Sequence, residues 1–120
     1  MTGAHTEAFP WTEGGVDLEV DIHRLDYFLP TLHLEGTVLI KIDVQGYSLN
    51  VLRGANQTLA SADMVLVETS FVGLYDGEAT FDQVYRFMVD AGFQFAGLLD
   101  QLEHPKSGAI LQGDAIFLRA

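Results

Sequence analysis

The 120-residue sequence contains no cysteine, few basic residues and no long apolar run. Without cysteine there is no disulfide framework and no thiolate chemistry, which fits a cytoplasmic setting. The apolar runs are much shorter than the roughly 20 residues that a membrane-spanning helix needs, so no membrane partner is expected. The first residues also lack the basic and then apolar layout of a secretory signal.

The scarcity of basic residues makes the chain strongly acidic. Six Lys and Arg stand against 17 Asp and Glu, and the formal net charge is −11 at pH 7. This balance argues against nucleic acid and against an anionic membrane surface as partners. The four histidines show no metal-ligand spacing with one another, so no metal site is predicted. The hydrophobic share of 48% is ample for the core of one domain.

The N-terminal part of the sequence differs in pattern from the rest. Residues 1–15 are predicted to be a poorly ordered lead-in, and residues 16–120 to be the folded part. In residues 16–22 apolar and acidic residues alternate strictly, which predicts a half-exposed strand at a sheet edge. Asp26 is then predicted to cap one helical turn that ends before Pro30.

Strand and helix patterns alternate after this point. Residues 38–44 and 64–68 are short and nearly all apolar, as is typical of parallel strands covered on both faces. A helical spacing interrupted at Gly54 follows the first strand, and Thr80 begins a helix after the second. Because a strand followed by a helix and another strand forms a parallel pair with a right-handed crossover, this part predicts an α/β fold.

The C-terminal part is predicted to be an antiparallel hairpin. Residues 93–99 and 114–119 are strand patterns separated by a polar loop that is too short for a helical crossover. Gly92 suits the C-terminal cap of the helix before them. The predicted fold class is therefore α/β, with parallel strands, flanking helices and a C-terminal antiparallel hairpin.

Asp43 is unusual because it lies in the otherwise apolar strand 38–44. Alternation puts Lys41 and Asp43 on one face, about 7 Å apart. Ligands of open α/β sheets bind beyond the carboxyl ends of the strands, where both Asp43 and Glu68 lie. If the two strands are parallel, we expect both carboxylates to reach one rim and a common hollow. The alternative is that Asp43 pairs with Lys41 or caps the next helix.

Gly46 follows Asp43 at the predicted turn from strand to helix. A residue without Cβ can take positive φ there and lets the backbone approach a ligand closely. Gln45 and Tyr47 flank Gly46 and could reach into the same crevice. The alternative is that Gly46 only makes a turn.

The segment IKIDVQGYSLNVLRGA resembles the I-D-V-E/Q-G-x-E-x-x-V-L-x-G-A segment of FkbM-type S-adenosylmethionine-dependent methyltransferases. The likeness continues through ADMVLVETSFVGLYDG and FDQVYRFMVDAGF to LQGDAIFLR, and covers roughly residues 20–119. The fold of this family is a Rossmann-like sheet in which helices flank parallel strands and a last hairpin adds one antiparallel strand. The resemblance therefore implies the same fold class as the pattern of elements.

The resemblance also implies an activity, which is transfer of a methyl group from S-adenosylmethionine to a hydroxyl of a small molecule or sugar. It implies that Asp43 is catalytic, beside the acceptor hydroxyl and the methionine end of the cofactor, with Gln45 and Gly46 as the cofactor-binding wall. We expect Glu68 and Tyr47 to lie on the substrate-binding side.

The sequence also departs from the family. Ser48 stands where the family usually has Glu, so the role of that acidic side chain is not carried over. The family binds its cofactor with a Gly-rich turn after the first strand and an acidic residue that ends the second, and neither is present. Gly14 and Gly15 precede an exposed strand pattern instead. The chain is thus similar to the C-terminal half of such a domain.

This difference leads to a prediction about the sheet edge. In the full fold another strand pairs with the strand at 38–44, and without it that strand presents unpaired backbone groups. We expect the isolated chain to be marginally stable, to aggregate, or to pair its open edge with another copy. The alternative to an enzyme is therefore a non-catalytic half-domain, or a truncated product, that associates through this edge.

Overall fold

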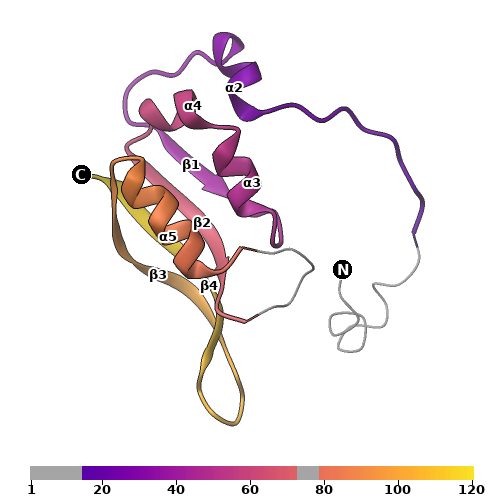
Figure 1. Cartoon of the computed structure of the whole chain (residues 1–120), viewed down its shortest axis with the longest axis vertical. Helices are drawn as coiled ribbons and strands as arrows, with labels where there is room; N and C mark the ends of the chain where they lie inside the picture. The colour runs from indigo at the N-terminus through magenta and orange to yellow at the C-terminus, as the bar shows by residue number, and fades with distance from the viewer. Residues whose placement is uncertain (1–14, 73–78) are drawn as a thin grey trace.

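Two apolar runs form neighbouring parallel strands, as the sequence predicts. The computed structural model describes residues 15–72 and 79–120. In it, β1 spans Leu39–Ile42 and β2 spans Met64–Ser70, and the two pair in parallel. β1 is shorter than predicted and β2 is longer. The carboxyl ends of both strands therefore lie at one end of the sheet (Figure 1).

The C-terminal hairpin is confirmed and completes a sheet of four strands. β3 spans Phe93–Glu103 and β4 spans Ile110–Arg119, and they pair antiparallel. β4 also pairs antiparallel with β2, so the strand order is β1-β2-β4-β3. The α/β fold with parallel strands and a terminal antiparallel hairpin is therefore as predicted. β1 is therefore an edge strand of the sheet.

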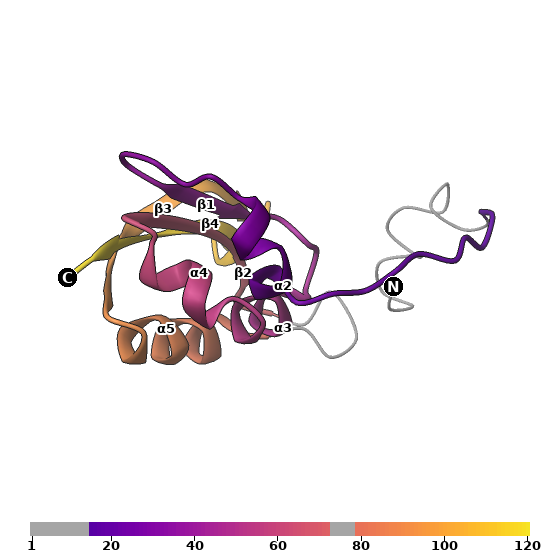
Figure 2. The ribbon, with the colours of Figure 1, turned by 90° about the horizontal axis from the view of Figure 1, so that it is seen from above.

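The predicted helices cover one face of this sheet. α3 spans Ser48–Arg53 and α4 spans Asn56–Ala60, with the predicted break at Gly54 between them. α5 spans Phe81–Asp90. Figure 2 shows α3, α4 and α5 together on the same side of the strands. Within the described residues, no helix is long and apolar enough to cross a membrane.

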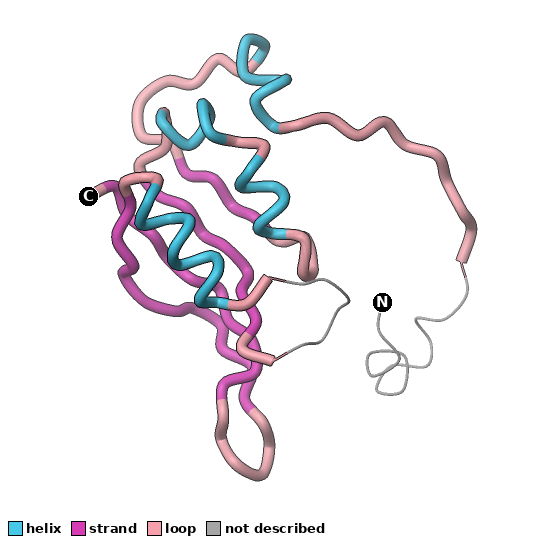
Figure 3. Tube along the Cα trace, viewed as in Figure 1, coloured by secondary structure: helices cyan, strands magenta, loops and turns pink. Residues whose placement is uncertain are grey.

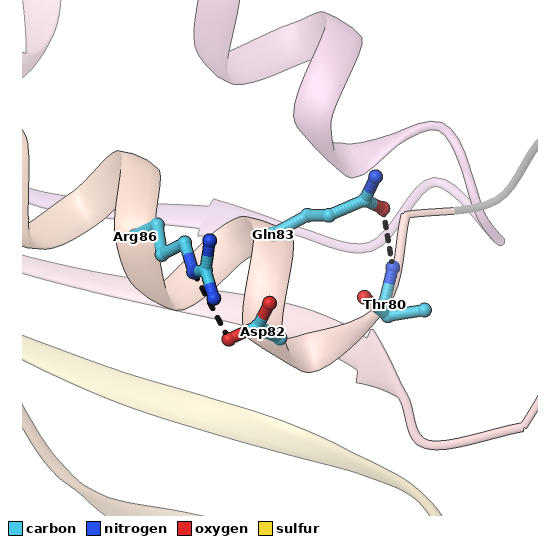
Figure 4. A network of polar contacts seen from close by, with 4 residues as sticks. All are labelled: Thr80, Asp82, Gln83 and Arg86. Carbon is cyan, nitrogen blue, oxygen red and sulfur yellow. Dashed lines mark hydrogen bonds and ion pairs between the residues drawn. The ribbon is translucent and has the colours of Figure 1, made fainter.

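The start of α5 is fixed by the predicted capping box. The backbone N–H of Thr80 donates to Oε1 of Gln83 at 3.0 Å, and an ion pair between Arg86 and Asp82 follows one turn later (Figure 4). After the helix, Gly92 takes a positive φ of 93°, which a residue without Cβ adopts easily. Residues at its two ends therefore determine where α5 begins and ends.

The hydrophobic core lies between the helices and the face of the sheet that they cover. The helix-facing strand residues are buried, and so are the residues of α3 to α5 that meet them. They include Ile42, Val65, Val67, Ala115 and Phe117 from the strands, and Leu52, Leu59, Val84 and Met88 from the helices. Each large apolar side chain buried in this way contributes roughly 1.5–3 kcal/mol, so this layer supplies most of the stability.

The opposite face of the sheet carries no helix within the described residues (Figure 2). Large apolar side chains on that face are exposed: Leu39 by 55%, Met64 by 36%, Leu99 by 50% and Leu118 by 37%. The prediction that the strands are covered on both faces is therefore wrong for the part of the chain described. Nearly all-apolar strands are typical of sheets with two covered faces, which is why the sequence suggested two.

The predicted edge strand at residues 16–22 is also wrong. The structure describes these residues as extended chain without secondary structure, and their four apolar side chains are 75–85% exposed. The segment runs away from the sheet and pairs with none of its strands (Figures 1 and 3). The alternation favours a strand, but a strand needs a partner to pair with. Residues 1–14 of the predicted lead-in lie outside the described residues.

The helical turn after this segment forms, but Asp26 does not cap it. α2 spans Leu25–Phe28 with Arg24 at its N-cap, and a 3₁₀ turn, Leu29–Thr31, follows and includes Pro30. The carboxylate of Asp26 instead accepts hydrogen bonds from the first turn of α4. Asp26 therefore attaches the N-terminal part of the described chain to the helical layer.

Candidate functional site

The turn between β1 and α3 places polar groups at the carboxyl end of β1. Asp43 follows the last residue of β1. Gln45 and Gly46 then take positive φ angles of 50° and 94°, and the Tyr47 N–H donates to the carbonyl of Val44 at 3.4 Å. The sequence foresaw the turn at Gly46, but it did not indicate that Gln45 would share the left-handed conformation. The turn presents these residues at the end of the sheet where ligands of α/β proteins bind.

Ser48 connects this turn to β2. Its side chain is buried, with 2% exposure, and its Oγ donates to the carbonyl of Glu68 at 3.0 Å. A hydrogen bond between a helix start and the next strand fixes the spacing between them. Ser48 therefore has a structural contact at the position where its sequence departs from the family pattern.

Asp43 has no structural partner among the described residues. It is exposed, it makes no ion pair with Lys41, and it accepts no capping hydrogen bond from α3, whose N-cap is Tyr47. Both structural alternatives from the sequence therefore lack a supporting contact in this part of the chain.

Asp43 lines a cavity of about 610 Å³. The cavity lies beside β1 and is bounded by α3 and by the segment that enters α2. Tyr47 and Asn50 also line it, and most of the remaining lining is apolar. This volume is within the range of small-molecule sites, which are mostly apolar with a few polar groups that orient the ligand.

Glu68 occupies a different position from the one expected. β2 continues to Ser70, so Glu68 lies within the strand, opposite Asp114 of β4. It lines a separate hollow of about 10 Å³, together with Gly46 and Ser48. Asp43 and Glu68 therefore lie at the same end of neighbouring parallel strands, as predicted, but each lines a different hollow.

Further carboxyl groups gather at this end of the sheet. Burial raises the pKa of Asp114, and the nearby charges of Asp43 and Asp100 raise it further, while Lys41 lowers it. Strand register and alternation place Lys41 and Asp114 on the face that the helices leave open, and Asp43, which follows β1, is near enough for its charge to act on Asp114. The rim therefore has a negative field that favours a cation or a hydroxyl donor. No group of three or more histidines or carboxylates in residues 15–72 and 79–120 is arranged to hold a metal ion.

The structure divides the predicted site residues between two places. Asp43 and Tyr47 line the larger cavity, Gly46 and Glu68 line the small hollow, and Gln45 lines neither. Sequence reasoning missed other residues of the site, which are His23, Arg24, Asn50 and Asp114. For Asp114 a signal existed, because it is an acidic residue next to the apolar run Ala115 to Leu118, as Asp43 is next to apolar residues of its own strand.

The sequence of the chain is similar to that of known methyltransferases. Residues 1–95 match the family described as the methyltransferase FkbM domain. The chain is 31% identical over 74 residues to the 2-O-methyltransferase NoeI of Sinorhizobium fredii. This match covers 62% of the chain and spans only 30% of the length of that relative.

The fold is similar to that of solved methyltransferases. Two structures of the magnesium protoporphyrin IX methyltransferase of Synechocystis PCC 6803, one with bound SAM and one with bound SAH, each match with a TM-score of 0.51. Sequence identities are 12% and 11%, and the match covers 73% of this chain but 42% and 48% of the two neighbours. At this identity the likeness concerns the fold alone.

Proposed function

The chain belongs to the FkbM methyltransferase domain family, and we propose that it forms the acceptor side of an O-methyltransferase site. The methyl group would pass from S-adenosylmethionine to a hydroxyl of a small molecule or sugar. In this proposal residues 16–120 are the C-terminal part of a Rossmann-like domain and residues 1–15 are a lead-in. The family match and the similarity to a 2-O-methyltransferase support the proposal.

The position of Asp43 is the observation on which the proposal depends. Its carboxylate lies at the carboxyl end of β1, beside a cavity of ligand size, and has no ion pair or cap among the described residues. A carboxylate in such a place can orient an acceptor hydroxyl and accept its proton as the oxygen attacks. Tyr47, which lines the same cavity and is 57% exposed, would position the acceptor.

The residues of this chain fit one wall of a cofactor site. Asp43 and the turn at Gln45 and Gly46 present a carboxylate and close backbone approach at the end of β1, which suits a positively charged sulfonium or ammonium group. When bound, S-adenosylmethionine supplies an electrophilic methyl group, and catalysis then depends largely on positioning. The Gly-rich turn and second acidic strand end that bind the rest of this cofactor in the family are absent from the 120 residues.

The first test is calorimetric titration of the 120-residue chain with S-adenosylmethionine and with its demethylated product. We expect no saturable binding, because only one wall of the site is present. Tight saturable binding would mean that the Gly-rich turn and the second acidic strand end are dispensable for cofactor binding. Our assignment of the cofactor site would then be wrong.

The second test needs a protein in which this sequence is joined to a Gly-rich cofactor-binding segment. There, Asp43→Asn should lower kcat by about 100-fold or more, the usual effect of losing a general base, and should lower it far more than the affinity for S-adenosylmethionine. Asp90→Asn, an exposed aspartate at the end of α5, is the matched control. An unchanged kcat in Asp43→Asn would return this aspartate to a structural role.

A non-catalytic role remains the second candidate, and one observation favours it. β1 is an edge strand, and within the described residues no strand pairs with its outer edge. A half-domain or truncated product with such an edge can associate with another chain through backbone hydrogen bonds. Failure of both binding and catalysis in the joined protein, with association retained, would favour this candidate.

A further inference from the structure

The cavity beside β1 follows the edge of the strand rather than one of its faces. Three consecutive residues of β1, Ile40 to Ile42, line it, and consecutive strand residues point to opposite faces of a sheet. Its other walls are the α3 residues Asn50 and Val51 and the segment that enters α2. The cavity is therefore a groove along the unpaired edge of β1 that continues past its carboxyl end.

Residues 16–22 have the sequence of a strand but no partner. Val16, Leu18, Val20 and Ile22 form one row and are 75–85% exposed, while Asp17, Glu19 and Asp21 form the other row. Exposure of four large apolar side chains on one short segment is unfavourable, and burying each would contribute to stability. Pairing of this segment with an open strand edge would therefore be favourable.

The groove and the segment are complementary in polarity and in charge. Apolar side chains line the groove, among them Ile40, Ile42, Val44, Val51 and Phe28, and they match the apolar row. The groove also holds Arg24 and Lys41, two of the six Lys and Arg of a chain with net charge −11, against one carboxylate, Asp43. The acidic row of the segment has no basic residue, so it would meet two of the few cations available.

We propose that residues 16–22 of one copy of the chain pair with the β1 edge of a second copy, so that two chains exchange these segments. The occupant is a second copy rather than the same chain for a geometric reason. Ile22, His23 and Arg24 already form a wall of the groove, and Arg24 is extended, with φ −67° and ψ 149°. The chain before this wall runs away from the sheet (Figure 1).

A direct pairing of two β1 edges would leave the apolar side chains of residues 16–22 exposed to solvent. β1 has only four residues, and an edge-to-edge dimer would keep the apolar row of residues 16–22 exposed. Segment exchange covers the row and both edges together, and it does so twice in a two-fold dimer. Asp43 and Tyr47 line the same groove, so a paired segment and a bound acceptor would compete for it.

The first experiment measures the molar mass of the whole 120-residue chain by sedimentation over a wide concentration range. We expect a dimer that dissociates on dilution. Leu18→Ser should weaken the dimer at least about tenfold, because each copy loses one buried leucine. Leu102→Ser makes the same chemical change at an exposed leucine of the distant hairpin, 51% exposed, and should leave the dimer unchanged.

The second experiment locates the contact, which the absence of native cysteine makes straightforward. Chains carrying Glu19→Cys are mixed with chains carrying Leu39→Cys and treated with a short bismaleimide. We expect cross-linked dimers, because cross-strand neighbours have Cβ atoms roughly 5 Å apart. Glu19→Cys mixed with Glu103→Cys, at the far end of β3, is the control that should not cross-link.

Each other outcome overturns the proposal. A monomer at every concentration means that the segment does not pair with a second copy. A dimer that Leu18→Ser and Leu102→Ser weaken equally means association through exposed apolar surface in general. A chain with both Glu19→Cys and Leu39→Cys that cross-links within a monomer means that the segment folds back onto its own β1 edge.

Discussion

Asp26 provides the sharpest test of how the chain holds its helical layer together. Its carboxylate accepts hydrogen bonds from the backbone N–H groups of Gln57 and Thr58, at 3.0 and 2.8 Å, and from Thr58 Oγ1 at 2.7 Å. These N–H groups belong to the first turn of α4, whose own N-cap, Ala55, has no side chain that can cap it. Asp26 therefore acts as the cap of a helix that begins about thirty residues later in the sequence.

The expected cost of Asp26→Ala follows from this geometry. Loss of a capping side chain costs about 1 kcal/mol, and the partial exposure of Asp26 keeps the charge contribution small. For a chain of this length, that corresponds to a fall in Tm of about 3–6 °C, measurable by circular dichroism. Asp26→Asn, which keeps one oxygen acceptor, should lose less. Asp90→Ala changes an exposed aspartate elsewhere and should stay within about 0.5 kcal/mol of the parent chain.

The pH dependence of this effect has a definite sign. Burial raises the pKa of Asp26, but hydrogen bonds from Gln57 and Thr58 and the charge of Arg24 outweigh it and hold the pKa below the usual value of 3.8. A carboxyl group whose pKa is lower in the folded state stabilises the fold above its unfolded pKa, and the stabilisation is lost as the pH falls through the folded value. The difference in unfolding free energy between the parent chain and Asp26→Asn should therefore shrink below about pH 4.

Two results would refute this account of Asp26. If Asp26→Ala unfolds at the same temperature as the parent chain at neutral pH, the three hydrogen bonds do not stabilise α4. If the difference between parent and Asp26→Asn grows on acidification, the carboxylate is destabilising in the folded state, and the sign of the argument is wrong.

The remaining predictions concern the end of the sheet. Ser48→Ala should lower the free energy of unfolding by about 1 kcal/mol, since it removes the hydrogen bond to the Glu68 carbonyl, whereas Ser61→Ala at an exposed serine should change little in the same urea titration. Asp114→Asn should raise stability at neutral pH by less than about 1 kcal/mol, because the raised pKa of Asp114 marks a charge that the fold disfavours. The gain should vanish below pH 3.8, the ordinary value for aspartate, and a gain that persists there would contradict the charge argument.

Local patterns in the sequence predicted most of the elements, because neighbouring residues determine them. The two apolar runs, the break at Gly54, the capping box at Thr80 and the C-terminal hairpin all depend on residues a few positions apart. Asp26 shows where this reasoning fails. A local rule assigned it to the nearest helix start, whereas its hydrogen-bond partners lie on α4, which no spacing in the sequence indicates.

The prediction for residues 16–22 failed for a related reason. Alternation describes which side chains would share a face if a strand formed, but it does not supply the neighbouring strand. The same argument applies to the open face of the sheet, where Leu39 and Met64 belong to strands that look fully buried in sequence. In both places the sequence specifies a surface that favours contact with another chain segment, but no local pattern identifies that segment.

The candidate site was predicted in its chemistry but not in its geometry. Strand order and direction place Asp43 and Glu68 at the same end of neighbouring strands, as alternation and parallel pairing imply. However, β2 runs two residues further than its apolar pattern, so Glu68 stays within the sheet opposite Asp114, while Asp43 leaves β1 and reaches the groove. The carboxylate of Asp43 is therefore accessible to a ligand, whereas Glu68 lies beside Asp114 within the sheet. For this reason the proposed chemistry rests on Asp43 alone, and the other acidic groups contribute through the field at the rim.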